Sequence, residues 1–166
     1  MDVVPERIFE EFLTSVLDER FPEVESLTEQ QKKASFAALS RKDLFTILPT
    51  GHAKSIIFQL LPDVCKYLSL RGYSYPRHAI ILVICPLKSL VDSHIRELRN
   101  RGLPATSLSS PDVDEQNLLK GAYSFVFGSP ESFLQNEKWR NMIRSKLYQE
   151  RTFAIVTDEV HVVPKW

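Results

Sequence analysis

The residues best placed to do chemistry form a short segment at 48–55, with the sequence LPTGHAKS. The segment follows an apolar run at 43–48 that has the composition of a buried strand. A tight turn between a strand and a helix aims backbone N–H groups at phosphate oxygens, and the helix dipole adds to the attraction. In such a loop Lys54 would reach the β- and γ-phosphates of a nucleotide, and the Ser55 hydroxyl would coordinate Mg²⁺. The segment therefore predicts a phosphate-binding loop.

A second segment, TDEVH at 157–161, also comes directly after an apolar run, FAIV at 153–156. Asp158 would lie at the carboxyl end of a strand, where its carboxylate would hold the coordination shell of Mg²⁺. Glu159, the next residue, would orient or deprotonate the attacking water. Nucleoside triphosphate chemistry needs mainly positioning and charge neutralisation, which these parts supply. The order of the two segments and their strand context predict a P-loop NTPase.

The loop departs from the pattern G-x-x-x-x-G-K-[ST] at both glycine positions, which hold Leu48 and Ala53. The first departure is harmless when Thr50 and Gly51 make the turn. The second has a cost if the position needs a positive φ, because a residue with a Cβ atom then loses about 1–2 kcal/mol. Such a cost corresponds to about a tenfold loss in nucleotide affinity, which weakens the site without abolishing it.

The ordered set of motifs resembles the first motor domain of RecQ-type DNA helicases, within the second helicase superfamily. The resemblance covers nearly all of residues 20–166, and the set is far more specific than any one motif. The matching segments are LPTGHAKS with IIFQLLP at 48–62, VICPLKSLV at 83–91, FGSPESF at 127–133, IVTDEVH at 155–161 and VVPKW at 162–166. The acidic box has Val160 where the family usually has alanine.

The resemblance implies ATP and Mg²⁺ as cofactors and a role for each matching residue. The catalytic residues would be Lys54, Asp158 and Glu159, with Mg²⁺ held by Ser55 and Asp158. The ATP-binding residues would be Gln31, Thr50, Gly51, His52, Ala53, Lys54 and Ser55. The nucleic-acid contacts would be Lys88, Ser89, Ser129 and Trp166. His161 would couple the state of the nucleotide to a partner domain.

Some of these positions have a structural alternative that the sequence leaves open. Thr28, with Gln31 three residues later, forms the pattern of a capping box. Gln31 therefore has two open interpretations, as a cap of its own helix and as an adenine contact, and one residue can do both. Lys88 and Ser89 also fit a helix N-terminal cap pair, and the motif context favours a phosphate contact only mildly.

Other polar residues are interpreted mainly as structural. Ser129, followed by Pro130, fits an ordinary helix start, and its role in nucleic-acid contact stays open. His52, His78 and His94 lack the partner spacing of metal ligands, and we expect them at the surface.

Apolar runs alternate with helical patterns along the chain, which predicts an α/β, RecA-like domain whose parallel sheet is covered by helices on both faces. Strands are expected near 43–48, 79–85, 105–108, 124–127 and 153–157. Helices are expected near 5–20, 29–39, 54–69, 88–101, 112–120 and 130–147. Pro5 fits the first turn of the first helix, and Gly102 fits the end of the fourth.

Composition places few limits on the partners. Lys plus Arg and Asp plus Glu both number 21, so the bulk charge gives no nucleic-acid signal. Cys65 and Cys85 fall in apolar runs, which predicts buried, reduced thiols. The N-terminus has no apolar run of signal length, and no stretch approaches transmembrane length, so we expect an intracellular protein with no membrane partner. A nuclear location is expected only because of the resemblance to DNA helicases.

We therefore expect the ATP-binding half of a RecQ-like DNA helicase, with single-stranded and duplex DNA as partners and a 3′-to-5′ polarity implied by the resemblance. Residues 1–26 would be an N-terminal helix and lead-in, and 27–166 the ATP-binding domain, truncated after the acidic box. The second RecA-like domain would be a partner absent from this chain. The parent would be an ATP-hydrolysing, DNA-unwinding enzyme, and the activity of the chain itself stays open. The alternatives are a non-catalytic remnant that binds nucleotide or nucleic acid, and an RNA helicase or another P-loop NTPase.

Overall fold

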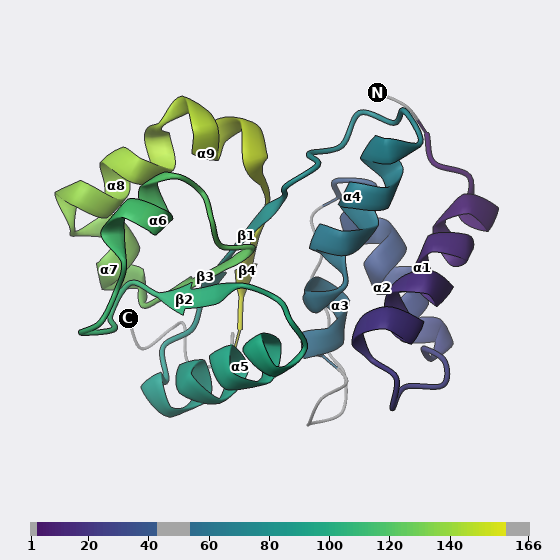
Figure 1. The fold of residues 1–166 in the computed structure, drawn as a ribbon, viewed down its shortest axis with the longest axis horizontal. Helices are drawn as coiled ribbons and strands as arrows, with labels where there is room; N and C mark the ends of the chain where they lie inside the picture. Colours follow the sequence, from purple (N-terminus) through teal and green to yellow (C-terminus); the bar gives the residue numbers. More distant parts are fainter. Residues whose placement is uncertain (1–2, 43–53, 159–166) are drawn as a thin grey trace. The chain divides into compact units, whose positions relative to one another are not determined.

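The computed structural model describes residues 3–42 and 54–158. The chain divides into two compact units, Met1–Ala79 and Ile80–Trp166 (Figure 1). The described part of the first unit is helical, and the second unit contains a sheet with helices. The predicted strand at 43–48 lies outside the described residues.

The helices of the first unit are α1 (Glu6–Arg20), α2 (Glu29–Leu39), α3 (Ser55–Gln59) and α4 (Leu61–Leu70). Pro5 precedes α1, where its fixed φ suits the helix start and its missing N–H needs no partner. The Thr28 hydroxyl accepts from the N–H of Gln31, and Oε1 of Gln31 accepts from the N–H of Thr28. The predicted helices at 5–20 and 29–39 and the predicted capping box are confirmed.

Side chains fix α1 against α4. The rings of Phe12 and Tyr67 stack with their centroids 5.6 Å apart. Nε of Arg20 donates a 3.0 Å hydrogen bond to Oδ2 of Asp63, which is only 8% exposed. The guanidinium neutralises a carboxylate that would be costly to bury alone. The N-terminal helix is thus an integral part of the first unit.

The prediction of one continuous helix at 54–69 is wrong, because two helices occupy this stretch. The break lies at Leu60, and α4 begins with Leu61 and Pro62. Proline has no N–H to donate to the preceding turn, and its ring clashes with the carbonyl four residues back. Pro62 therefore fits the first turn of a new helix better than the middle of a long one.

The second unit contains four parallel strands in the order β2-β3-β1-β4. Its strands are β1 (Ile80–Ile84), β2 (Ala105–Ser107), β3 (Phe125–Gly128) and β4 (Thr152–Thr157). Its helices are α5 (Lys88–Asn100), α6 (Glu115–Leu119), α7 (Pro130–Leu134), α8 (Glu137–Arg144) and α9 (Lys146–Arg151). Val83 of the central β1 pairs with Phe127 of β3 and Val156 of β4. The predicted α/β class with a parallel sheet is confirmed.

Helices cover both faces of this sheet. Ile80, Leu82 and Val126 form a buried cluster with residues of α6 to α9, including Tyr148. Successive strand residues point to opposite faces, and Phe127, next to Val126, contacts α5 instead. Figure 1 shows α5 on one side of the sheet and α6 to α9 on the other.

Tyr148 is the largest fully buried side chain of this cluster. Its hydroxyl donates a 2.6 Å hydrogen bond to the carbonyl oxygen of Leu118 at the end of α6. Burial disfavours the phenolate and raises the pKa of Tyr148 to about 12. The hydroxyl therefore stays protonated and ties α9 to α6.

The prediction of one helix at 130–147 is also wrong, because α7, α8 and α9 share this stretch. Oδ1 of Asn136 accepts a hydrogen bond from the N–H of Lys138 and caps α8. Oγ of Ser145 accepts from the N–H of Tyr148 and caps α9. Short polar side chains that satisfy the backbone in this way favour a new helix start over continuation of the previous one.

The end of α5 follows the prediction. Gly102 has a φ of 78°, a left-handed conformation that costs glycine little. The N–H of Leu103 then donates to the carbonyl oxygen of Leu98 at 2.9 Å, as in a Schellman motif. The chain can therefore turn directly from α5 into β2.

Both cysteines are buried and free, as predicted. Burial raises the pKa of the Cys65 thiol, so this thiol stays protonated and unreactive. Cys85 lies just after β1 and is 2% exposed.

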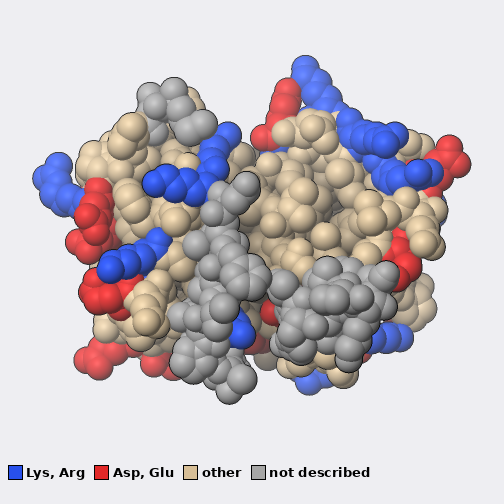
Figure 2. Space-filling model, turned by 180° about the vertical axis from the view of Figure 1, so that it is seen from behind, with Lys and Arg blue, Asp and Glu red and all other residues tan. Residues whose placement is uncertain are grey.

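Positive and negative side chains are interspersed on the face drawn in Figure 2, in keeping with the equal totals of basic and acidic residues. Bulk charge therefore does not point to a binding surface, and a basic site has to be sought locally. In the part of the chain that the structure describes, no helix is both long and apolar enough to cross a bilayer.

Candidate functional site

The carboxyl ends of the four parallel strands meet at one edge of the sheet. Cys85 follows β1, Leu108 follows β2, Ser129 follows β3 and Asp158 follows β4. Open α/β sheets bind their ligands outside this edge, where the connecting loops supply polar groups. The sheet therefore brings together segments that the sequence analysis selected separately, at 83–91, at 127–133 and at the acidic box.

A pocket of about 560 Å³ extends from this edge along α5, and its other wall consists of β2 and the segments that follow β2 and β3. Its basic residues are all on α5, and they are Lys88, Arg96 and Arg99. Its hydroxyl residues are Thr106, Ser107, Ser109, Ser110 and Ser129. Asp92 is the acidic residue of the lining. Cationic groups and hydroxyl donors around a concave surface suit a phosphate-bearing ligand.

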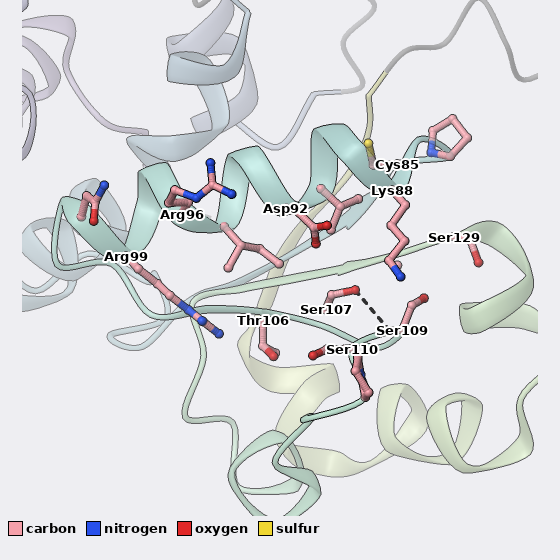
Figure 3. Close-up of a pocket in the computed structure, with 16 residues that line it drawn as sticks. Cys85, Lys88, Asp92, Arg96, Arg99, Thr106, Ser107, Ser109, Ser110 and Ser129 are labelled. Atoms are coloured by element: carbon pink, nitrogen blue, oxygen red, sulfur yellow. Dashed lines mark hydrogen bonds between the residues drawn. The ribbon is translucent and has the colours of Figure 1, made fainter.

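Two of the basic side chains, those of Lys88 and Arg99, lie at opposite ends of the pocket. Figure 3 shows Lys88 and Arg99 extending from α5 toward the opposite wall, which carries Ser109 and Ser110. Nε of Arg99 donates a 3.0 Å hydrogen bond to the carbonyl oxygen of Ala105. This bond fixes the guanidinium beside β2, so part of the positive charge is preorganised.

The hydroxyl groups form a connected set. Oγ of Ser129 lies 2.9 Å from Oγ of Ser132, which lies 3.2 Å from Oγ of Ser109. Oγ of Ser107 accepts from the N–H of Ser109 at 3.2 Å. These bonds hold the loops after β2 and β3 together on one wall of the pocket.

Lys88 and Ser89 do not cap α5. The N-cap residue is Leu87, which makes no side-chain capping bond, and Lys88 is the first helical residue. The alternative interpretation of the pair as a cap is therefore wrong. Lys88 lines the pocket, whereas Ser89 is not among the lining residues within the described part of the chain.

Ser129 combines both of the roles that the sequence left open. Its hydroxyl accepts a 3.1 Å hydrogen bond from the N–H of Ser132 and caps α7, with Pro130 at the helix start. The same residue lines the pocket. The structural interpretation of Ser129 is confirmed, and its position keeps the prediction of a nucleic-acid contact in place.

Asp158 lies immediately after β4. Its N–H donates to the carbonyl oxygen of Ile84 at 3.0 Å, so the backbone of Asp158 is anchored to β1. Its Oδ2 lies 3.0 Å from Nε2 of His94 on α5. The prediction that His94 is a surface residue is wrong, because its side chain is only 13% exposed. His78 is exposed, as expected.

The structure also adds residues that the sequence analysis did not select. Arg96 and Arg99 of α5 and Ser109 and Ser110 after β2 line the pocket. The run SSP at 109–111, directly after the predicted strand at 105–108, was a signal for the serines, because loops at strand ends carry ligand contacts. Arg96 and Arg99 resemble ordinary helix-surface residues in the sequence.

The predicted phosphate-binding residues belong to the first unit. Lys54 is the residue before α3, and Ser55 is the first residue of that helix. Gln31 takes part in the capping box through both its N–H and its Oε1. Several other predicted site residues lie outside the described residues, namely Thr50, Gly51, His52, Ala53, Glu159, His161 and Trp166.

These features define a RecA-like α/β domain with a polar ligand site at the carboxyl edge of its sheet. The sequence profile of the DEAD/DEAH box helicase family matches residues 28–166. The chain belongs to the DEAD/DEAH box helicase family.

Relatives with curated names support the resemblance to RecQ-type proteins. The chain is 35% identical over 143 residues to the ATP-dependent helicase SGS1 of Saccharomyces cerevisiae, and the aligned residues cover 82% of this chain and 9% of SGS1. It is 31% identical over 134 residues to the ATP-dependent DNA helicase RecQ of Synechocystis, covering 77% of this chain and 25% of the relative. It is 28% identical over 138 residues to the ATP-dependent DNA helicase Q1 of Rattus norvegicus, and the aligned residues cover 78% of this chain and 20% of the relative. The RecQ resemblance is confirmed, and the chain spans a quarter or less of these relatives.

Proposed function

We propose that the chain is the ATP-binding half of a RecQ-like DNA helicase, which couples ATP hydrolysis to the separation of DNA strands. The observation that carries the proposal is that Asp158 and the pocket are both anchored at the end of β1. Asp158 is bonded to Ile84, and Cys85, the next residue, lines the pocket. The residue proposed to hold Mg²⁺ and the pocket proposed to hold nucleic acid are thereby connected through two adjacent residues, Ile84 and Cys85.

The residues of the chain have distinct proposed roles toward ATP. Lys54 would pair with the phosphates, and Gln31 would contact the adenine in addition to capping α2. Glu159 would orient the attacking water, and His161 would pass the nucleotide state to a second RecA-like domain, the proposed partner. The relatives carry the words ATP-dependent and helicase in their names, which supports ATP as the nucleotide.

The donors proposed for Mg²⁺ fit this ion. Ser55 and Asp158 offer hydroxyl and carboxylate oxygens, which are the ligands that Mg²⁺ prefers. Residues 3–42 and 54–158 contain no cluster of three or more His, Cys, Asp and Glu side chains. A bound ion would therefore keep phosphate oxygens and waters as its remaining ligands, as Mg²⁺ usually does. When bound, Mg²⁺ would neutralise the charge of the phosphates.

The pocket between α5 and the loops after β2 and β3 would hold the sugar–phosphate backbone of a single strand. Lys88 and Ser129 would contact phosphates, together with Arg99. Contacts of this kind position a strand without selecting its sequence. Trp166 is proposed to stack on a base, and Ser89 to contact the strand from outside the pocket. The DNA-helicase role also implies a nuclear location and 3′-to-5′ polarity.

The proposal is tested first by nucleotide binding. Lys54→Ala should lower the affinity for a fluorescent ATP analogue in the presence of Mg²⁺ by roughly tenfold or more, because a phosphate-paired ammonium is lost. Lys66→Ala, an exposed lysine of α4, is the matched control and should bind as the wild type does. Equal affinities for wild type and Lys54→Ala would sink the assignment of the loop.

The nature of the nucleic acid is tested by comparing matched single strands of DNA and RNA. A DNA helicase should bind the DNA strand at least as tightly, and ATP hydrolysis should rise when that strand is added. Preference for the RNA strand would favour the RNA-helicase alternative. Binding without stimulation of hydrolysis would favour a non-catalytic remnant.

A further inference from the structure

His94 lies on the face of α5 that packs on the sheet. Val91 and Leu98, three residues before and four residues after it, are both buried in the same helix. The imidazole ring stacks on Phe127 of β3, with the ring centroids 5.7 Å apart and an interplanar angle of 18°. Phe127 itself is fully buried. The plane of the imidazole is therefore set by packing before any polar contact is considered.

The polar edge of this ring is directed at the acidic box. Nε2 of His94 lies 3.0 Å from Oδ2 of Asp158, and the two side chains are 13% and 16% exposed. The backbone of Asp158 is held separately, by the hydrogen bond from its N–H to Ile84. The residue is therefore fixed twice, through its main chain to β1 and through its side chain to α5.

A contact of this kind matters for a ligand of a metal shell. A carboxylate that ends a strand without a side-chain partner can rotate among several rotamers, and ordering it when the metal binds costs conformational entropy. Removing a residue that is hydrogen-bonded to a metal ligand, and so orients that ligand, typically lowers metal affinity by about 10–100-fold. His94 has the geometry of such a partner, because its ring is locked by Phe127 and its nitrogen is engaged by Asp158.

We propose that His94 is a positioning residue for Asp158, which it holds in one orientation for the Mg²⁺–nucleotide complex. This inference rests on the proposed function, since it assigns a role toward the same site. His94 contacts neither the metal nor the phosphates in this role. It sits on the helix that supplies Lys88 and Arg99 to the pocket, so the orientation of Asp158 depends on the position of α5.

The test compares two substitutions of His94 that differ in one property. His94→Gln keeps an N–H donor toward Asp158, whereas His94→Leu fills similar space without a donor. For each variant, the affinity for a fluorescent ATP analogue is measured with and without Mg²⁺. The quantity compared is the ratio of the two affinities, which is the gain due to Mg²⁺. We expect His94→Leu to lower this gain by about tenfold and to leave Mg²⁺-free binding unchanged, while His94→Gln retains most of the gain.

A second measurement does not depend on nucleotide or on the substitutions of His94 folding. The ring ¹⁵N signals of His94 are recorded by NMR in the wild type and in Asp158→Asn, and they should differ. Identical signals overturn the inference. It is also overturned if folded His94→Leu shows the same Mg²⁺-dependent gain in nucleotide affinity as the wild type. An equal loss in folded His94→Gln and His94→Leu also overturns it, because the donor is then irrelevant.

The outcomes separate this inference from the proposed function. A wild-type chain that shows no Mg²⁺-dependent nucleotide binding overturns both, and the NMR comparison then reports only whether the pair forms. Normal binding that is lost in Lys54→Ala, together with an unchanged gain in His94→Leu, overturns this inference alone.

Discussion

The basic residues of the pocket make a quantitative prediction for the salt dependence of strand binding. Each phosphate that a protein neutralises on a single strand contributes about −0.7 to the slope of log affinity against log salt concentration. Lys88 and Arg99 both extend from α5 into the pocket. If each neutralises one phosphate, raising the salt from about 50 to about 200 mM should weaken their share of the binding by about sevenfold.

Lys88→Ala should remove one of these contacts. The slope should become shallower by about 0.7, and the share of the salt effect due to the pocket should fall to about 2.6-fold. The assay is fluorescence anisotropy of a labelled single-stranded DNA over a series of salt concentrations. Only the slope is diagnostic, because a structural defect would weaken binding equally at every salt concentration.

A control with the same change in net charge is Lys146→Ala. Lys146 is exposed on α9 and lies outside the pocket lining, so its substitution should leave the slope unchanged. The reasoning is refuted if Lys88→Ala keeps the wild-type slope. It is also refuted if both substitutions change the slope equally, because long-range charge rather than a phosphate contact would then explain the effect.

Two further predictions concern stability. Tyr148→Phe should lower the free energy of unfolding by about 1–3 kcal/mol below pH 10, because the buried carbonyl of Leu118 loses its donor. The pKa of Tyr148 in the folded protein is raised to about 12 from an ordinary 10. Its stabilising effect is therefore complete below about pH 10 and is lost as the pH rises toward 12. The free energies of unfolding of the wild type and Tyr148→Phe, measured by urea melts, should converge over this range, and a constant difference would contradict the assignment. Arg41 has a φ of 59° and contacts Ser74 and Tyr75, so Arg41→Gly and Arg41→Ala lose the same contacts but only the glycine relieves the backbone. Arg41→Gly should be more stable than Arg41→Ala by about 1 kcal/mol in the same melts, and the reverse order would show that the left-handed conformation is not costly.

Local signals in the sequence predicted much of the fold. The helix at Glu29–Leu39 begins at a capping box whose two hydrogen bonds involve residues three positions apart. The turn after α5 depends on Gly102, where the left-handed conformation is a property of one residue. The apolar runs that became β1 and β3 were recognisable because strands covered on both faces are almost continuously apolar.

The errors arose where several weak signals compete. The stretch at 130–147 has helical residues throughout, and only the caps at Asn136 and Ser145 divide it. Such caps are hard to distinguish from exposed polar residues, because both types are common on helix surfaces. The division at Leu60 depended on weighing Pro62 as a start rather than as an interruption.

The candidate site was predictable only in part, because it combines residues that are distant in the sequence. Lys88, Ser129 and Asp158 were found from their motifs, and the sheet brings their segments to one edge. The contact between His94 and Asp158 required knowledge of how α5 packs. A signal was present, since His94 has the helical spacing of the buried residues Val91 and Leu98. Polar residues on an apolar helix face therefore merit a search for a buried partner.

The strand order has a consequence for synthesis on the ribosome. β1 is the first strand of the second unit to be made, and its sequence IILVI is apolar throughout. Both of its partners come later, with β3 beginning at Phe125 and β4 at Thr152. At about 5–20 residues per second, β1 waits roughly 4–15 s for its second neighbour. Until β4 is made, β1 can pair on one side only, with β3. An uncharged, β-prone segment with an open edge is of the kind that aggregates, so the yield of soluble protein should depend on how quickly translation proceeds through β4.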